Sequence, residues 1–216
     1  MHSLLDLSRV RRVLCIGAHS DDIEIGAGGL IARLVAENPA IEFRWVVFGC
    51  ADPTRRDEAA KAAKLFVPNI GEHRLSLHAF RDGFFEFQGE QLKEQFEKLK
   101  SDFEPDLILT HHDDDRHQDH RLVSRLTWNT WRNHAILEYE IMKYDGDLGR
   151  PNVFVPLSKE MAERKIANLH AAFETQTKRQ WFTEDVFRAL LRLRGVECNA
   201  TSGYAEAFHA RKIVAS

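Results

Sequence analysis

Cysteine is scarce in this sequence. Cys15, Cys50 and Cys198 are the only three among 216 residues. An odd number of widely spaced cysteines argues against a disulfide framework and suits a reducing cytoplasm. Cys15 and Cys50 stand in apolar, strand-like runs, so we expect them to be small buried side chains. Residues 1–12 lack a basic segment followed by an uninterrupted apolar one, so we expect no signal peptide and a cytoplasmic location.

The sequence also lacks a long apolar run and an excess of one charge. No apolar run approaches the roughly 20 residues that span a bilayer, so we expect no membrane span. The formal net charge is −3, with basic and acidic residues mixed along the chain, which gives no electrostatic case for binding nucleic acid or an anionic membrane. Hydrophobic residues make up 44% of the chain, enough for the core of one domain. We place that domain over residues 1–216, because no repeat, low-complexity stretch or long linker divides them.

Up to residue 133, patterns typical of buried strands alternate with patterns typical of helices. Short apolar runs indicate buried parallel strands, and apolar residues three or four positions apart indicate helices. This order predicts an α/β fold, a Rossmann-like three-layer sandwich with a mostly parallel central sheet. The predicted strands are 13–18, 41–50, 74–80 and 106–110, and the predicted helices are 30–35 after glycines 26, 28 and 29, 55–66 capped by Thr54, 92–103 and 119–133.

The second half of the chain departs from this alternation. Strand patterns cover 136–144, 152–156 and 204–214, and helix patterns cover 158–172 and 183–194. Gly195 follows the last of these helices and is a typical stop signal.

The first predicted strand ends in the segment AHSDDIEIGAGG, residues 18–29. His19 and Asp22 stand three residues apart in the turn after this strand, at the carboxyl edge of the sheet, where open α/β folds bind ligands. Imidazole and carboxylate groups both bind zinc, and Asp21 between them can point across the metal. The alternative is a capped helix N-terminus, in which Asp21 or Asp22 accepts backbone N–H bonds. The segment alone leaves both interpretations open, and without GxGxxG it is not a dinucleotide fingerprint.

Histidine is concentrated after another predicted strand. The segment THHDDDRHQDH, residues 110–120, holds four of the 11 histidines. Because the ends of two parallel strands meet at the same sheet edge, His117, Asp119 and His120 can share a cleft with His19 and Asp22. A mononuclear catalytic zinc uses three protein ligands and one open position for water. His19, Asp22 and one of these histidines supply that number, whereas the alternative for either segment is a solvated charged loop.

The two segments closely resemble the paired signatures of the LmbE/PIG-L family of zinc-dependent N-acetylglucosamine-type deacetylases. The segments FGCADPTRRDEAAKAA, FRDGFF, PDLILTHHDDDRHQDH and TSGYAEAF are also similar to the family, so the resemblance spans nearly the whole chain. It implies a hydrolase that removes acetyl from an N-acetylated amino sugar, either a glycoside, a nucleotide-linked sugar or a glycan precursor. It also implies one zinc ion per chain, held by His19, Asp22 and His120, with iron as the other metal that these ligands accept.

The resemblance implies further roles for residues around the metal. Asp21 acts as the general base for a metal-activated water that attacks the amide. His117 assists either at the carbonyl oxygen, where it stabilises the oxyanion, or at the leaving group, and Asp119 orients its imidazole and favours its charged form. Arg56 matches the family's arginine and is a candidate substrate-binding residue, although a helix-surface arginine paired with neighbouring carboxylates is an equal alternative.

Two positions depart from the family pattern. Ser20 and Gln118 stand where the family usually has proline, which puts the rigidity of both loops in doubt. The implied partner is a small-molecule amino sugar, and a homo-oligomer agrees with the trimers and larger rings that the family often forms. The alternatives are an amidase acting on a thiol conjugate or an N-acyl antibiotic intermediate, and a non-enzymatic binding module. A pure binder needs no general base, so Asp21 and His117 argue against the last.

Overall fold

The structure, a computed structural model, describes residues 6–214. They form one seven-stranded sheet in the order β3-β2-β1-β4-β5-β7-β6. The first five of these strands run parallel, β7 is antiparallel to β5, and β6 is antiparallel to β7. The predicted α/β fold with a mostly parallel sheet is therefore confirmed. The expectations for a domain over 1–216 and for residues 1–12 extend into 1–5 and 215–216, which lie outside the described residues.

The bounds of the strands are β1 (Arg12–Gly17), β2 (Glu42–Val47), β3 (Leu75–Leu77), β4 (Leu107–His111), β5 (Ala135–Tyr139), β6 (Val153–Leu157) and β7 (Tyr204–His209). The bounds of the helices are α1 (Asp22–Glu37), α2 (Pro53–Phe66), α3 (Gly89–Asp102), α4 (Gln118–Thr130), α5 (Lys159–Ala172) and α6 (Glu184–Glu197).

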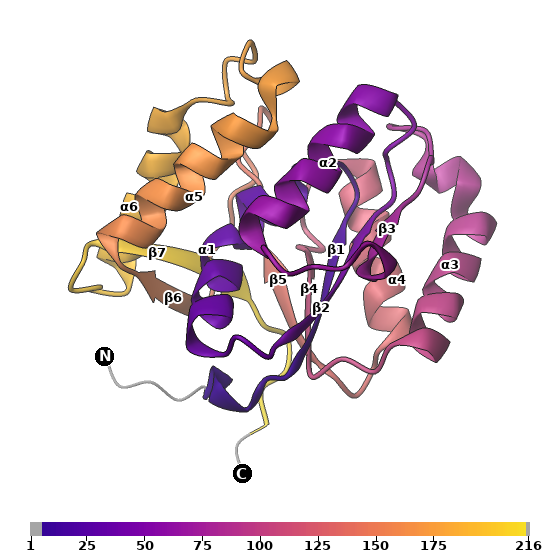
Figure 1. The fold of residues 1–216 in the computed structure, drawn as a ribbon, viewed down its shortest axis with the longest axis horizontal. Helices are drawn as coiled ribbons and strands as arrows, with labels where there is room; N and C mark the ends of the chain where they lie inside the picture. Colours follow the sequence, from indigo (N-terminus) through magenta and orange to yellow (C-terminus); the bar gives the residue numbers. More distant parts are fainter. Residues whose placement is uncertain (1–5, 215–216) are drawn as a thin grey trace.

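Strand β1 contributes to two hydrophobic cores, one on each face of the sheet. Val13 and Cys15 belong to one core, and Leu14 and Ile16 belong to the other, because successive strand residues point to opposite faces. Helices α1, α2 and α5 cover the first face, and α3 and α4 cover the second (Figure 1). These are the three layers predicted from the alternating pattern.

Several helix boundaries differ from the prediction, and the starts of α1 and α2 have a clear physical reason. Helix α1 begins at Asp22, so its glycines lie inside the helix, and Gly26 is required because an added Cβ would overlap the ring of Tyr139. Helix α2 begins at Pro53 and is capped by Asp52 rather than Thr54. Proline favours the first helical position because its fixed φ suits it and its missing N–H is not needed there.

Two predictions for the second half were wrong in detail. Helix α6 continues through Gly195 to Glu197, and Gly195 is needed because a Cβ there would overlap the carbonyl oxygen of Gly203. Strands β5 and β7 end at Tyr139 and His209, before the predicted ends. The apolar residues beyond Tyr139 include Ile141, which is buried in the core without belonging to a strand.

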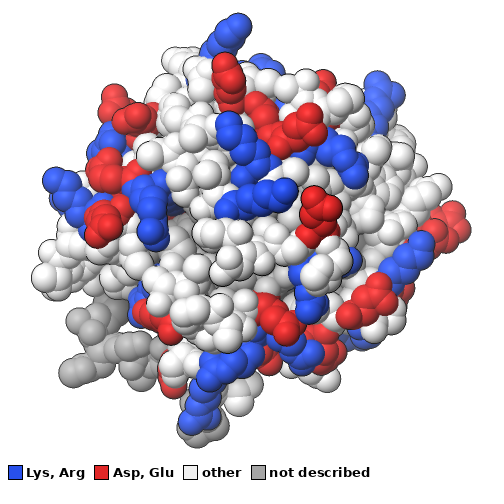
Figure 2. All heavy atoms as spheres, in the orientation of Figure 1, with Lys and Arg blue, Asp and Glu red and all other residues white. Residues whose placement is uncertain are grey.

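Among residues 6–214, no helix combines the length and the apolar character needed to cross a bilayer. Basic and acidic side chains are interspersed on the face drawn in Figure 2, as the sequence predicted. All three cysteines are free and buried, including Cys15 and Cys50.

Candidate metal centre

The two motifs meet at the carboxyl ends of β1 and β4, which are neighbouring parallel strands. His19 lies in the turn after β1, and Asp22 is the first residue of α1. His117 is the N-cap of α4, and His120 lies in the first turn of that helix. The topology therefore brings together the residues that we expected to share a cleft.

Three donor groups face one another at this point. Nδ1 of His19 lies 3.1 Å from Nε2 of His120. The carboxylate of Asp22 lies alongside, with Oδ2 3.5 Å from Nδ1 of His19 and Oδ1 3.5 Å from Nε2 of His120. Ligands about 2.0–2.1 Å from a tetrahedral ion are about 3.3 Å apart. The spacing of these atoms therefore fits a zinc-sized ion.

The opposite ring nitrogens of both histidines are held by carboxylates. Nδ1 of His120 donates to Asp115 at 2.9 Å, and Nε2 of His19 lies 3.2 Å from Asp119. If each histidine carries its proton on that side, Nδ1 of His19 and Nε2 of His120 face each other as two lone pairs beside the carboxylate of Asp22. Such an arrangement is favourable only when a cation lies between the donors. The chemistry of the donor set therefore also fits a metal.

The pKa values reflect the crowding of these groups. Burial, followed by the charge of nearby His111, lowers the pKa of His120 to about 4. Burial raises the pKa of Asp22, but the charges of His120 and His111 outweigh it and hold the value well below the ordinary one. A neutral His120 and an ionised Asp22 suit metal binding. Burial lowers the pKa of His19 as well, but hydrogen bonds with carboxylates, that of Asp119 first, outweigh burial and raise the pKa well above the ordinary value, so a metal has to displace a proton from His19.

Other possible donors surround these three. His111 and His117 each lie close enough to join a three-residue donor set, the first with Asp22 and His120, the second with His19 and His120. Asp82 lies 3.0 Å from Nε2 of His19, but its side chain is largely exposed. Geometry alone therefore leaves the ligand set open, and His19, Asp22 and His120 stay a prediction.

Asp21 is buried and paired with a cation. Nη2 of Arg55 lies 3.0 Å from Oδ2 of Asp21. Burial raises the pKa of Asp21 above the ordinary value, and the positive charge of Arg55 opposes this rise. A second carboxylate, that of Glu58, holds Arg55 from the other side at 2.6 Å.

The structure does not bring Arg56 to the site. Arg56 is exposed, and its guanidinium donates to the carbonyl oxygen of Leu77 at 2.7 Å. Arg55 takes the position that we expected for Arg56. Its link to Glu58, three residues along the same helix, is the sequence signal that could have identified it.

The environment of His117 also differs from the expectation. Nδ1 of His117 accepts the backbone N–H of Asp119, and the carboxylate of Asp119 instead contacts His19 and accepts the backbone N–H groups of Gly83 and Phe85. The negative charge of Asp119 raises the pKa of His117, as we expected, but burial and the charge of His19 outweigh it and lower the pKa. The orienting role assigned to the Asp119 carboxylate therefore applies to His19.

Ser20 and Gln118, the two residues that stand where the family usually has proline, lie in the two motifs that contain the donor groups. Ser20 is buried, and its Oγ has no hydrogen-bond partner among the described residues. Gln118 begins α4, and its side-chain Nε2 donates to the carbonyl oxygen of Gly83 at 3.4 Å. Gln118 lacks the fixed φ of proline, but its side chain forms a hydrogen bond with the loop after β3.

A cavity of about 530 Å³ opens over the donor groups. Asp21, Asp22, His19, His117 and His120 line it, together with Arg55. Residues from other segments of the chain also line it, among them Arg81, Asp82, Lys143, Tyr144, Asp145, Gln176, Arg179 and Trp181.

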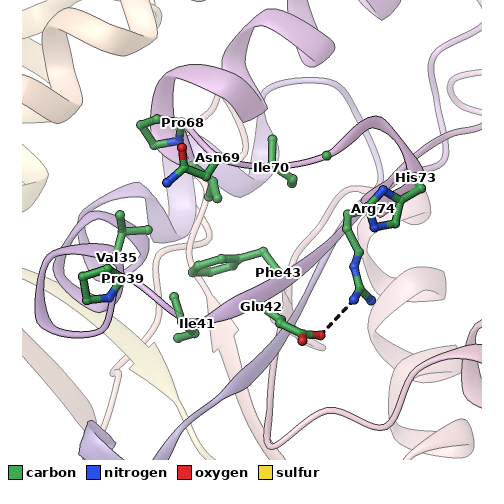
Figure 3. A pocket seen from close by; sticks show the side chains of 12 residues that line it. Val35, Pro39, Ile41, Glu42, Phe43, Pro68, Asn69, Ile70, His73 and Arg74 are labelled. Carbon is green, nitrogen blue, oxygen red and sulfur yellow. Dashed lines mark hydrogen bonds and ion pairs between the residues drawn. The ribbon is translucent and has the colours of Figure 1, made fainter.

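A second hollow lies at the opposite end of the sheet, beside the start of β2 (Figure 3). Its volume is about 230 Å³. Val35, Ile41, Phe43 and Ile70 give it an apolar lining, and the ion pair of Glu42 with Arg74 lies at its edge. None of the predicted site residues lines it, so the cavity over the donor groups is the candidate site.

Comparisons with known proteins identify relatives of this chain. A family model described as PIG-L: GlcNAc-PI de-N-acetylase matches residues 14–131, a range that contains both motifs. A relative from Escherichia coli (strain K12), named uncharacterized deacetylase YaiS, is 30% identical over 178 residues, which cover 77% of this chain and 94% of the relative.

Solved structures show the fold. N,N'-diacetylchitobiose deacetylase from Pyrococcus horikoshii has a TM-score of 0.71 and 20% identity, and the match covers 94% of this chain and 85% of that one. The 4-carboxy-2-hydroxymuconate hydratase GalB from Pseudomonas putida KT2440 has a TM-score of 0.69 and 18% identity, with coverage of 95% and 98%. A deacetylase and a hydratase thus share this fold, so the reaction must be argued from the site.

Proposed function

This chain belongs to the GlcNAc-PI de-N-acetylase (PIG-L) family, and from that premise we propose that it is a metal-dependent hydrolase that removes acetyl from an N-acetylated amino sugar. The observation that carries the proposal is the position of Asp21. This carboxylate borders the same cavity as the donor groups of His19, Asp22 and His120, and a partly buried arginine, Arg55, holds it. A binding module has no need of such a base.

We assign the metal to His19, Asp22 and His120. Nitrogen and oxygen ligands of this kind bind zinc well, and they also bind iron. When bound, the metal supplies a Lewis acid that polarises the amide carbonyl and makes a coordinated water more acidic. Asp115 and Asp119 hold the two imidazoles in the tautomers that leave Nε2 of His120 and Nδ1 of His19 free for the ion.

Asp21 serves as the general base. It accepts a proton from water as the water attacks the acetyl carbonyl, and Arg55 keeps its carboxylate oriented and favours its ionised form. His117 stands beside His19 and His120, with ring centroids 4.8 and 4.6 Å away. We assign it the stabilisation of the oxyanion or the donation of a proton to the leaving amine.

The proposed substrate is a small molecule with an acetylated 2-amino sugar. The similar fold of the chitobiose deacetylase and the deacetylase name of the Escherichia coli relative support this choice. The cavity is within the usual range of small-molecule sites. We place the protein in the cytoplasm, which agrees with three free cysteines. A homo-oligomer stays a prediction.

A panel assay tests the proposal. The purified protein is incubated with N-acetyl sugars, their N-propionyl analogues, a thiol-conjugate amide and an N-acyl glycopeptide, and amine and carboxylic acid release are both measured. We expect release of acetate from a sugar, loss of activity with a chelator and recovery with zinc. Cleavage of only the thiol-conjugate or glycopeptide amide would replace the substrate assignment, and no amide cleavage with the metal bound would overturn the enzyme assignment.

A further inference from the structure

Lys143 lines the candidate cavity together with the donor groups. It follows β5, its side chain is 9% exposed, and its Nζ lies 3.0 Å from Oδ2 of Asp115. On its other side Nζ contacts Asp147, whose carboxylate also accepts the backbone N–H of Arg116 at 2.7 Å. Two carboxylates therefore fix the ammonium group close to the candidate metal centre, where a positive charge opposes the binding of a cation.

Lys143 and His120 share a single acceptor atom. Oδ2 of Asp115, which contacts Lys143, is also the atom that accepts from Nδ1 of His120 at 2.9 Å. The other oxygen, Oδ1, accepts the backbone N–H of His117 at 2.8 Å. Asp115 thus has no carboxylate oxygen that serves His120 alone.

This sharing has a chemical consequence. A carboxylate that accepts a hydrogen bond from one imidazole nitrogen makes the other nitrogen a stronger metal ligand. An ammonium group on the same oxygen draws away part of that negative charge, so the carboxylate polarises His120 less. Lys143 therefore weakens His120 as a ligand without touching the donor atoms.

We infer that Lys143 is a positioning residue that lowers the affinity of the centre for its divalent ion and keeps the ion electron-poor. The inference rests on the proposed function, since it assumes that His120 is a ligand. A weaker donor leaves more positive charge on the ion, and thus a stronger Lewis acid. In this inference, lower metal affinity accompanies stronger Lewis acidity of the bound ion.

Metal affinity, measured by competition with a chelator, tests the inference without an activity assay. Lys143→Met should bind zinc about tenfold more tightly than the wild type, because a nearby positive charge is gone and Oδ2 of Asp115 accepts from His120 alone. Asp115→Asn should bind it about 10-fold to 100-fold more weakly. Lys143→Arg should resemble the wild type. Lys93→Met, which removes an ammonium group from α3, is the matched control and should leave the affinity unchanged.

A charge-neutral double variant separates the shared oxygen from a general charge effect. Lys143→Met with Asp147→Asn removes one positive and one negative charge, and it avoids an unpaired carboxylate at residue 147 that could impair folding. We expect it to retain severalfold tighter binding.

The outcomes distinguish this inference from the proposed function. Wild-type affinity in both Lys143→Met variants would overturn the inference alone, as would tighter binding in the single variant and not in the double one. A wild-type chain that binds no divalent ion would overturn both the inference and the metal assignment.

Discussion

Nη2 of Arg55 lies 3.0 Å from Oδ2 of Asp21, while the neighbouring Arg56 turns away to the carbonyl of Leu77. Consecutive residues on a helix point about 100° apart, so only one of the two arginines faces the cavity. This difference provides a matched pair of variants.

Replacement of Arg55 should impair catalysis, and replacement of Arg56 should not. Arg55→Gln removes the charge that holds Asp21, and we expect kcat/KM to fall about 10-fold to 100-fold, the usual cost of a hydrogen bond to a charged group. Arg56→Gln loses an exposed contact and should stay within about twofold of the wild type. Metal content, measured by elemental analysis, should be equal in both. Equal rates for the two variants would remove Arg55 from the site.

The three assigned ligands should each be required for metal binding. His19→Ala, Asp22→Ala and His120→Ala should each contain far less than one divalent ion per chain after dialysis, because a catalytic zinc has only three protein ligands and the loss of one weakens its binding strongly. His73→Ala is the control, since His73 borders the distant hollow, and it should keep the ion. Full occupancy in any of the three variants would remove that residue from the ligand set.

Sequence patterns located the fold and the position of the site because both depend on local signals. Apolar runs such as 13–18 predict buried strands, and the donors follow directly after two of these strands. In a parallel sheet, the carboxyl ends meet at one edge. His19, Asp22 and His120 are indeed brought together there, although their binding of a metal stays a prediction.

Partner choice could not be predicted in the same way. The carboxylate of Asp119 serves His19 rather than His117, and this depends on the path of residues 83–85, whose backbone N–H groups it also accepts. Lys143, in the segment after β5, contacts Asp115, in the segment after the neighbouring strand β4. Such contacts are set by tertiary packing and by helix rotation, for which a short motif contains no signal.

Asp21 should be required for the chemical step and not for the metal. Asp21→Asn keeps the shape of the side chain and removes its ability to take up a proton. We expect kcat to fall about 10²-fold to 10⁴-fold, the usual contribution of a positioned base, with metal content and melting temperature near the wild type. Near-native turnover in this variant would mean that another group accepts the proton.

His117 and His120 should respond differently to the same substitution. His117→Ala should keep the ion and lose about 10²-fold to 10³-fold in kcat, as expected when one oxyanion-stabilising group is removed. His120→Ala should lose the ion. If His117→Ala loses the ion and His120→Ala retains it, the roles of the two histidines must be exchanged.

The last prediction concerns stability against acid. His209 of β7 stacks on His112 with ring centroids 3.7 Å apart, and its Nε2 is buried without a partner among the described residues. Burial and the charge of His112 lower the pKa of His209 from 6.5 to about 4. Between these values an unfolded chain binds a proton at this residue and the folded chain does not, so stability falls as the pH falls from 6.5 to 4.

The variant His209→Phe preserves an aromatic ring against His112 and removes this titration. The free energy of unfolding should therefore fall less for the variant than for the wild type between pH 6.5 and 4. We expect the difference to be on the order of 1 kcal/mol, less than the full shift implies because the side chain is only partly buried. The neighbouring His112 titrates in the opposite direction. Burial lowers its pKa, but the hydrogen bond to Glu138 outweighs burial and raises the pKa, so protonation of His112 favours the folded state at low pH. The wild type and the variant both contain His112 and Glu138, so this contribution largely cancels when they are compared. Urea titrations across this range measure the difference, and His73→Phe serves as an exposed control. Parallel stability curves for wild type and His209→Phe would show that His209 is protonated in the folded protein as readily as in the unfolded chain.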